Sequence, residues 1–199
     1  VYRNPEIFYV LDKLKRQGKI CHYGVSVEKV DEALEALNYD ISAIEVIFNM
    51  FRLKPAEELF PKASKQNVGI IVRVPLASGL LTGKYSEETT FGKADHRCYN
   101  RNGEFFDKGE TFSGVDYMTG VKAARELKQL LHTDNLAARA LRYILMYPEV
   151  STVIPGASSP AQIMENVKAS SLPPFSHEEM EVVRQVYDKH IRSLVHHCW

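Results

Sequence analysis

Residues 68–85 read VGIIVRVPLASGLLTGKY, the stretch that decides the fold class. The run 68–74 is apolar except for one glycine and one arginine, and its apolar residues do not alternate strictly. Such a run is typical of a parallel strand covered on both faces. After it the chain turns at Pro75 and presents Gly79, Gly83, hydroxyls and one lysine. Free backbone N–H groups and positive charge can form a pyrophosphate cradle, so this stretch predicts an anion site at the end of a buried strand.

Arg73 interrupts the apolar run. Burying a guanidinium is costly unless it has a partner, so this position favours a functional site over an ordinary polar surface loop. From Leu76 to Gly114 regular patterns stop, and small, polar and charged residues dominate. Loops of this length inside compact domains are usually functional or disordered. We therefore expect 76–114 to be a long loop on the ligand side.

Helices and short strands alternate on both sides of this stretch. The β-prone runs are CHYGVSV (21–27), AIEVIF (43–48), VGIIVRV (68–74) and STVIPG (151–156). Helical spacing is expected between Asn4 and Gly18, from Val30 to Leu37, from Pro55, from Tyr117 to Leu131, from Leu136 to Leu145, from Pro160, and from Ser176. A helix followed by four strand-helix units implies an α/β fold with a parallel sheet and right-handed crossovers. Periodicity alone leaves open a small open sheet or a piece of a barrel.

Length and composition limit the size of the domain and the kinds of partner that the chain is expected to have. With 199 residues, 45% of them hydrophobic, the chain can bury the core of one domain. Its 25 basic and 25 acidic residues balance, which gives no electrostatic reason to expect nucleic acid or an anionic membrane as partner. No apolar run approaches the roughly 18 residues of a membrane span, and the first residues show no secretory signal. Three cysteines without CxxC spacing fit a reducing cytoplasm.

Two further candidate sites follow strands. Ser26 ends the first strand, where it either binds a carboxamide or phosphate or caps the next helix. Residues 156–166 follow the last strand, and Gln162 and Asn166 lie four apart on one helix face, where they could read an adenine edge. Gln162 is equally the capping-box partner of Ser159. Ligands of parallel α/β proteins bind where the strands end and the following helices begin.

Neither a metal site nor a catalytic group is predicted. The runs 95–98 (DHRC) and 196–198 (HHC) contain metal-ligating residue types, but neither has a second ligand pair at a useful spacing. The sequence also has no nucleophile elbow, no paired-carboxylate motif and no GxGxxG or GxxxxGK[ST] pattern. The chain therefore shows binding features without a catalytic group.

Together, these motifs resemble the aldo-keto reductases in order and spacing. The chain carries GVSV at 24–27, FNMF at 48–51, PLxSGxLTGKY at 75–85 and IPGxxxPxQxxxN at 154–166. The last two patterns are highly specific in combination, and the match extends from about Asn4 to the C-terminus. By this resemblance, residues 1–199 form a single partial domain, the C-terminal half of a (β/α)₈ TIM barrel with its fifth to eighth strands.

The resemblance also implies a cofactor, NADP with NAD as the alternative, bound in an extended form. Ser26 would hold the nicotinamide carboxamide, and Arg73 would stack on the nicotinamide where many members place an aromatic ring. The pyrophosphate would be lined by Leu76, Ser78, Gly79, Leu80, Thr82 and Lys84. Gly156, Ala157 and Ser158 would approach the adenosine ribose and any 2′-phosphate, and Gln162, Glu165 and Asn166 would surround the adenine.

Three positions depart from the family pattern. Val27 stands where many relatives have asparagine, Glu45 where many have glutamine, and Ser158 where many have arginine. The last difference leaves NADP versus NAD open, because a phosphate favours a bidentate cationic partner. The catalytic Asp, Tyr, Lys and His of the family come from its second to fourth strands, so no catalytic residue is carried over to this chain.

We therefore expect the cofactor-binding half of an NAD(P)H-dependent cytoplasmic oxidoreductase that reduces aldehydes or ketones to alcohols by hydride transfer. The chain would be inactive by itself. Its partners would be a small carbonyl substrate and the N-terminal half of the barrel or a second copy, without nucleic acid or membrane. Two alternatives stay open: a non-catalytic nucleotide-binding regulatory subunit, as in channel-associated relatives, and an independent four-stranded α/β interaction module.

Overall fold

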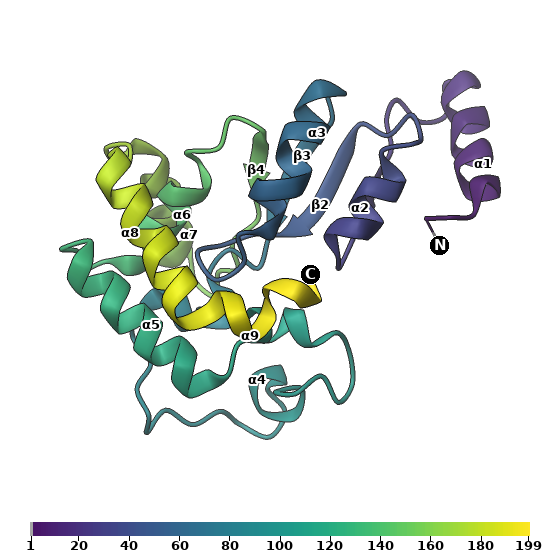
Figure 1. The fold of residues 1–199 in the computed structure, drawn as a ribbon. Coiled ribbons are helices and arrows are strands. Elements are labelled where there is room, and N and C mark those ends of the chain that lie inside the picture. Colours follow the sequence, from purple (N-terminus) through teal and green to yellow (C-terminus); the bar gives the residue numbers. More distant parts are fainter. Residues whose placement is uncertain (1) are drawn as a thin grey trace.

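A four-stranded parallel sheet forms the centre of the protein (Figure 1). The structure is a computed structural model that describes residues 2–199. Strands β1 (Gly24–Ser26), β2 (Ala43–Ile47), β3 (Gly69–Arg73) and β4 (Val150–Val153) lie side by side in chain order. Every neighbouring pair is parallel. The predicted α/β fold with helical crossovers is confirmed.

Helices occupy the predicted stretches, and one short helix lies inside 76–114, where the sequence predicts a loop. They are α1 (Pro5–Arg16), α2 (Val30–Ala36), α3 (Phe60–Lys65), α4 (His96–Tyr99), α5 (Tyr117–Leu130), α6 (Leu136–Ile144), α7 (Pro160–Lys168), α8 (His177–Tyr187) and α9 (Ser193–Val195). The Asn4 side chain accepts a hydrogen bond from the Glu6 N–H at 3.1 Å, and Ser176 and Glu179 form a capping box. These starts depend on neighbouring residues alone, so the sequence predicts them well. Within residues 2–199, none of the helices has both the length and the apolarity that crossing a membrane requires.

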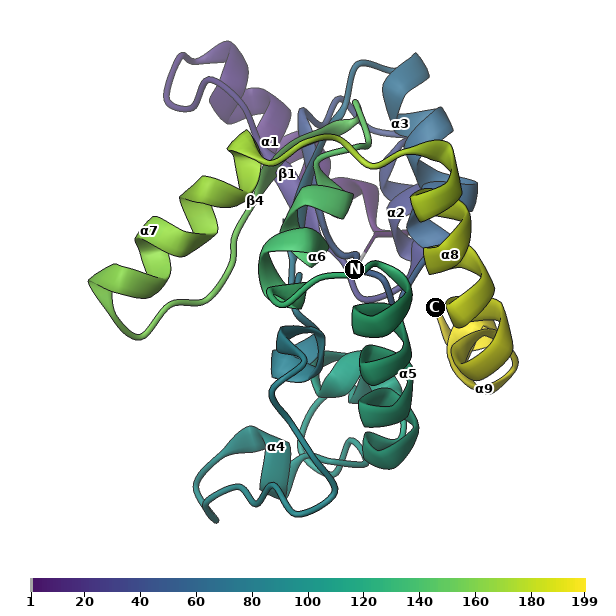
Figure 2. The same cartoon turned by 90° about the vertical axis from the view of Figure 1, so that its left-hand side faces the viewer.

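The sheet is packed on one face and partly open on the other. Ile70 and Val72 of β3 are fully buried, whereas Gly69 and Ile71, which alternate with them, are half-buried. The prediction that this strand is covered on both faces is therefore wrong for residues 2–199. Figure 2 shows the reason: α2 and α3 lie on one side of the sheet, and α7 lies on the other side and extends away from it.

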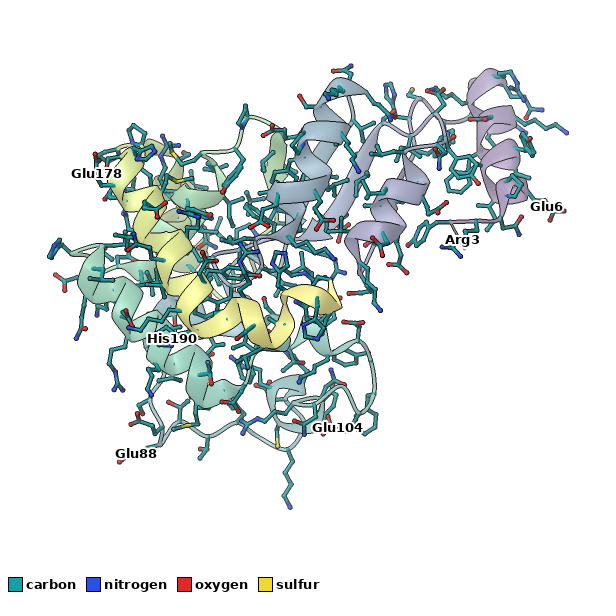
Figure 3. All side chains as sticks on the ribbon, in the orientation of Figure 1. Arg3, Glu6, Glu88, Glu104, Glu178 and His190 are labelled. Carbon is teal, nitrogen blue, oxygen red and sulfur yellow. The ribbon has the colours of Figure 1, made fainter. Side chains whose placement is uncertain are left out.

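The C-terminal part of the chain crosses α5 and holds it in place. Residues 188–192 continue α8 as a wider helical turn, and His190, labelled in Figure 3, lies in this turn. Its Nε2 is 2.7 Å from a carboxylate oxygen of Glu126 on α5, and the neighbouring Lys189 donates to the same carboxylate at 2.8 Å. These contacts fix the helices that lie beside the long loop.

The loop 76–114 has a defined shape, although it contains just the short helix α4 and three 3₁₀ turns. Asn100 is fully buried, its Oδ1 accepts from the N–H groups of Phe105 and Phe106 at 2.8 and 3.0 Å, and its Nδ2 donates to Thr111 at 3.2 Å. One buried amide thus joins residue 100 of the loop to residues 105, 106 and 111. Composition predicts a loop here, and Asn100 determines its conformation.

Apolar side chains are exposed on the helices at the two ends of the sheet. On α1, Ile7 and Val10 are 44% and 58% exposed, and on α7, Ile163 and Val167 are 53% and 61% exposed. None of the α7 side chains is buried. The edge strands β1 and β4 each pair with a single neighbour. Open strand edges beside apolar patches recruit partners.

We expect the purified 199-residue chain to self-associate or aggregate rather than remain a monomer, because these edges and patches lack a partner. Light scattering measures this directly. The double variant Ile163→Glu/Val167→Glu should reduce association, whereas Leu130→Glu, at an exposed apolar residue of α5, should change it little. A sharp monomeric mass with cooperative unfolding and no dye-accessible apolar surface would contradict the expectation.

Candidate functional site

A large cavity lies at the carboxyl ends of β3 and β4. Its volume is about 920 Å³, inside the roughly 300–1,000 Å³ range of small-molecule sites. The lining includes nine of the residues predicted from the sequence: Leu76, Ser78, Gly79, Thr82, Lys84, Gly156, Gln162, Glu165 and Asn166. The remaining lining residues are Val74, Pro75, His96, Arg97, Tyr99, Phe106, Glu110, Asn135, Ala137 and Ala161. The fold therefore brings two distant motifs to one site.

The turn after β3 has an unusual backbone. Val74, Ala77 and Ser78 have φ values of 50°, 48° and 53°, and Gly79 has 99°. Residues other than glycine rarely adopt this left-handed conformation, and for β-branched valine it is a marked outlier. Strain of this kind is found mostly at ligand sites. At Gly79 a Cβ would overlap the Tyr85 hydroxyl, so only glycine fits there.

The hydroxyls of this turn already have partners within the protein. The Ser78 hydroxyl donates to the Glu110 carbonyl at 3.0 Å and accepts from the Phe112 N–H at 3.0 Å. The Thr82 hydroxyl donates to the Gly79 carbonyl at 2.6 Å. Both side chains therefore shape the cavity wall. The N–H groups of Ala77 and Gly79 also have partners, because they donate to the Val74 and Leu76 carbonyls at 3.1 and 2.9 Å.

Leu80 differs from its neighbours in the same motif. Its side chain is buried and lies against Gly120 of α5, where an added Cβ would overlap it. It is not part of the cavity lining. Its backbone therefore belongs to the turn, while its side chain belongs to the core.

On the other wall of the cavity, the start of α7 is organised by side-chain caps. The Ser159 hydroxyl accepts from the Gln162 N–H at 3.3 Å, as expected for a helix cap. The Gln162 amide oxygen, however, accepts from the backbone N–H and the hydroxyl of Ser158, at 2.6 and 3.0 Å. The predicted capping box is thus half formed. Ala157 and Ser158 are exposed and lie outside the cavity lining.

Ser26 also lies outside this cavity. It is exposed at the end of β1, and its carbonyl oxygen accepts a hydrogen bond from the Tyr2 hydroxyl. The capping alternative is wrong, because α2 begins at Val30 and Lys29 occupies the cap position. Glu32 reaches back to accept from the Lys29 N–H at 3.0 Å instead.

Arg73 is held by carboxylates and does not line the cavity. Its side chain is 11% exposed, with Nη2 at 2.9 Å from Glu28 and Nη1 donating to Glu110. Nη2 also donates to the Val27 carbonyl at 3.0 Å, and Nε is 3.7 Å from Glu45. Its predicted stacking on a ligand ring stays a prediction, because these ion pairs engage the N–H groups and not the face of the guanidinium. In this structure Arg73 ties the ends of β1 and β2 to the loop 76–114.

A second arginine, which the sequence reading missed, is buried beside this network. Arg52 is 1% exposed, its guanidinium lies 4.0 Å from the centre of the Trp199 ring, and it donates to the Glu28 carbonyl. Burial lowers the pKa of Arg52 to about 10. Burial also raises the pKa of the Glu28 carboxyl, against the effect of Arg73. Arg52 stands between apolar residues, Phe51 and Leu53, just as Arg73 interrupts an apolar run. The same signal in the sequence therefore marks both arginines.

The loop contributes cavity residues that the sequence analysis does not assign to a binding site, including His96 and Arg97 from the run considered for a metal. His96, Arg97 and Tyr99 lie on or beside α4, and Phe106 and Glu110 follow it along the loop. Across residues 2–199, no group of three or more His, Cys, Asp and Glu side chains is arranged to hold a metal ion. These loop residues form the loop side of the cavity lining.

Comparison with known proteins places this geometry in context. A family model described as "Aldo/keto reductase family" matches residues 2–188. An uncharacterized oxidoreductase, YqkF, of Bacillus subtilis is 27% identical over 90% of this chain and 54% of its own length. A probable voltage-gated potassium channel subunit beta of Oryza sativa is 33% identical over 64% of this chain and 38% of its own length. The solved aldo-keto reductase AKR11C1 of Bacillus halodurans aligns with a TM-score of 0.67 at 27% identity, covering 91% of this chain and 55% of that one.

These matches cover between 64% and 91% of this chain but only part of each relative. The chain spans about half the length of the curated relatives it matches. The similarity extends to the fold, and it leaves the remaining part of each relative without a counterpart in residues 2–199.

Proposed function

The chain belongs to the aldo/keto reductase family, and on that premise we propose that it is the C-terminal half of the family's barrel. In this proposal the cavity binds a nicotinamide dinucleotide, NADP with NAD as the alternative. The complete protein reduces an aldehyde or ketone to an alcohol by hydride transfer, and the bound dinucleotide supplies the hydride. The observation that carries the proposal is the cavity, which joins the turn after β3 to the start of α7.

The residues present fit a dinucleotide. Ser78, Gly79 and Lys84 line the cavity and would lie beside the diphosphate, and Lys84 would supply positive charge. Gln162 and Asn166 on α7 would face the adenine. The cavity volume of about 920 Å³ lies within the range of small-molecule sites. Ser26 and Arg73, which lie outside the lining, would then act through the shape of the strand ends rather than through this cavity.

The arrangement of helices favours the N-terminal half of a barrel over a second copy as the partner. In a (β/α)₈ barrel one helix covers each gap between neighbouring strands. This chain has α1 before β1 and α7 after β4, so a second copy would bring two helices to each new gap. A complement of four strands and three helices avoids this conflict. Its strands would pair with the exposed edges of β1 and β4.

A second function is supported by one of the relatives. The rice protein named as a probable potassium channel subunit beta is 33% identical over 129 residues. If this chain has a similar role, its cavity would bind a nucleotide as a regulatory signal. A dinucleotide that binds without being consumed, in the presence of carbonyl substrates and a complete barrel, would favour this alternative.

Filling the cavity tests the proposed function. We expect Ala161→Trp to weaken NADPH or NADH binding at least about tenfold, because Ala161 lines the cavity and an indole would occupy ligand space. Met164→Trp is the matched control, since Met164 lies on the same helix, is exposed and does not line the cavity. Equilibrium titration of each variant gives the answer. Equal affinities in all three proteins, or no dinucleotide binding to the unaltered chain, would overturn the proposal.

A further inference from the structure

Trp199 packs into a pocket between Arg52 and the loop 76–114. Its ring is buried, and the Arg52 guanidinium carbon lies 4.0 Å from the ring centre. Two glycines of the loop leave room for this pair. At Gly114 a Cβ would lie 2.5 Å from the ring, and at Gly109 it would overlap the guanidinium. The indole therefore connects the end of this loop to Arg52.

The buried pair keeps polar atoms without partners in the protein. Within residues 2–199, Nε1 of Trp199 and both Nε and Nη1 of Arg52 are buried and accepted by no protein oxygen. A buried donor that has lost its hydrogen bond to water costs free energy, which exposure to water recovers. The buried position of Trp199 is therefore favoured by packing and opposed by desolvation, so a modest change nearby can move it.

His196 fastens the same segment three residues before Trp199. Its Nδ1 lies 2.9 Å from the Tyr187 hydroxyl on α8, and its Nε2 lies 3.5 Å from the Glu57 carboxylate. Nη1 of Arg192 is 3.2 Å from both ring nitrogens, and the imidazole side chain is just 17% exposed. A neutral ring can accept a hydrogen bond from a neighbouring donor, whereas a protonated ring meets the cation of Arg192 at close range.

The groups around His196 favour its neutral form. Arg192 donates two hydrogen bonds to the Glu57 carboxylate, which is therefore already paired. Burial lowers the pKa of His196, and the charges of Arg192 and Lys54 lower it further. The carboxylates of Glu57 and Glu58 act in the opposite direction. A histidine buried in its neutral form binds a proton more readily once it is released to water.

We propose that residues 196–199 form a pH-operated latch: neutral His196 holds Trp199 against the loop segment 108–114, and protonation of His196 releases both. The released histidine has the higher pKa, so the latch is closed above about pH 6.5 and opens as the pH falls below it. The released segment contains Glu110, which lines the cavity. The latch therefore controls one wall of the cavity, whichever ligand the cavity binds.

Fluorescence of Trp199, the only tryptophan of the chain, reports the state of the latch. We expect its emission to move to longer wavelength, and its quenching by acrylamide to increase, when the 199-residue chain is taken from about pH 8 to about pH 5. His196→Gln cannot be protonated and keeps an acceptor for the Tyr187 hydroxyl, so this variant should lose the response. His197→Gln is the matched control, because His197 is the next residue and is exposed. It should respond as the unaltered chain does.

Two measurements on Trp199→Ala test the same coupling from the other side. By linkage, removal of the indole should raise the pKa of His196 towards its ordinary value, which NMR titration of the imidazole signals measures. Hydrogen exchange, at a pH where the latch is closed in the unaltered chain, should become faster in residues 108–114 because the ring no longer packs on them.

The outcomes decide between a latch and a purely structural tail. Emission that does not change with pH, or that changes equally in His196→Gln and His197→Gln, would overturn the latch. The second result is also what acid unfolding of the whole chain would give. Where His196→Gln already exposes Trp199 at the highest pH, the titration of Trp199→Ala decides. A His196 pKa equal to that of the unaltered chain would overturn the latch, and a higher one would support it. Unchanged hydrogen exchange in residues 108–114 would overturn the link to the cavity wall.

Discussion

No carbonyl reductase turnover is expected from the 199-residue chain alone, with either NADPH or NADH. In the proposed half-barrel the general acid and the lysine that tunes it lie outside this chain. Loss of a positioned acid removes proton transfer worth about 10²–10⁴-fold, in addition to the positioning that the acid provides. Consumption of the reduced cofactor in the presence of aldehydes and ketones is the measurement. Dinucleotide binding by the same preparation is its control, because it shows that the chain is folded.

A variant of Tyr99 provides a further test of this prediction. It is a tyrosine that lines the cavity, and its ring packs edge-on against Phe105 and Phe106 at centroid distances of 5.3 and 6.2 Å. Turnover that survives repurification and disappears in Tyr99→Phe would show that the acid lies within this chain. The half-barrel proposal would then be wrong.

Arg73→Glu is expected to destabilise the fold strongly, by about 3–5 kcal/mol, the usual cost of breaking a buried ion pair. The change would replace the cation that faces Glu28, Glu45 and Glu110 with a fourth carboxylate. It would also detach the loop 76–114 from the ends of β1 and β2. Urea denaturation measures the free energy of unfolding directly.

Two variants control for this change. Arg73→Met removes the charge without reversing it, so its effect should be smaller than that of Arg73→Glu. Arg101→Glu reverses a charge on the exposed side of the same loop, where surface substitutions cost about 0.5 kcal/mol or less. Unchanged stability in Arg73→Glu together with a loss of dinucleotide affinity would restore the role expected from the sequence, in which Arg73 contacts the ligand.

The contrast between Arg73 and the helix caps shows how far sequence reasoning extends. Asn4 caps α1 through a residue two positions away, and Ser176 pairs with Glu179 three positions away. Such contacts form wherever the local backbone becomes helical. The partners of Arg73 are Glu28 and Glu110, 45 and 37 residues distant. Nothing in local spacing identifies them.

The sequence by itself determined the parallel α/β order, the helix starts, the position of the long loop and the two motifs that meet at the cavity. These features follow from periodicity, caps and turn residues, whose effects span a few positions. The tertiary structure alone decided that Arg73 pairs with carboxylates, that one face of β3 is partly open, and that Arg97 lies beside the left-handed turn. Each of these depends on which segments the crossovers and the buried Asn100 bring together, and a charged side chain takes its role from the partners it meets there.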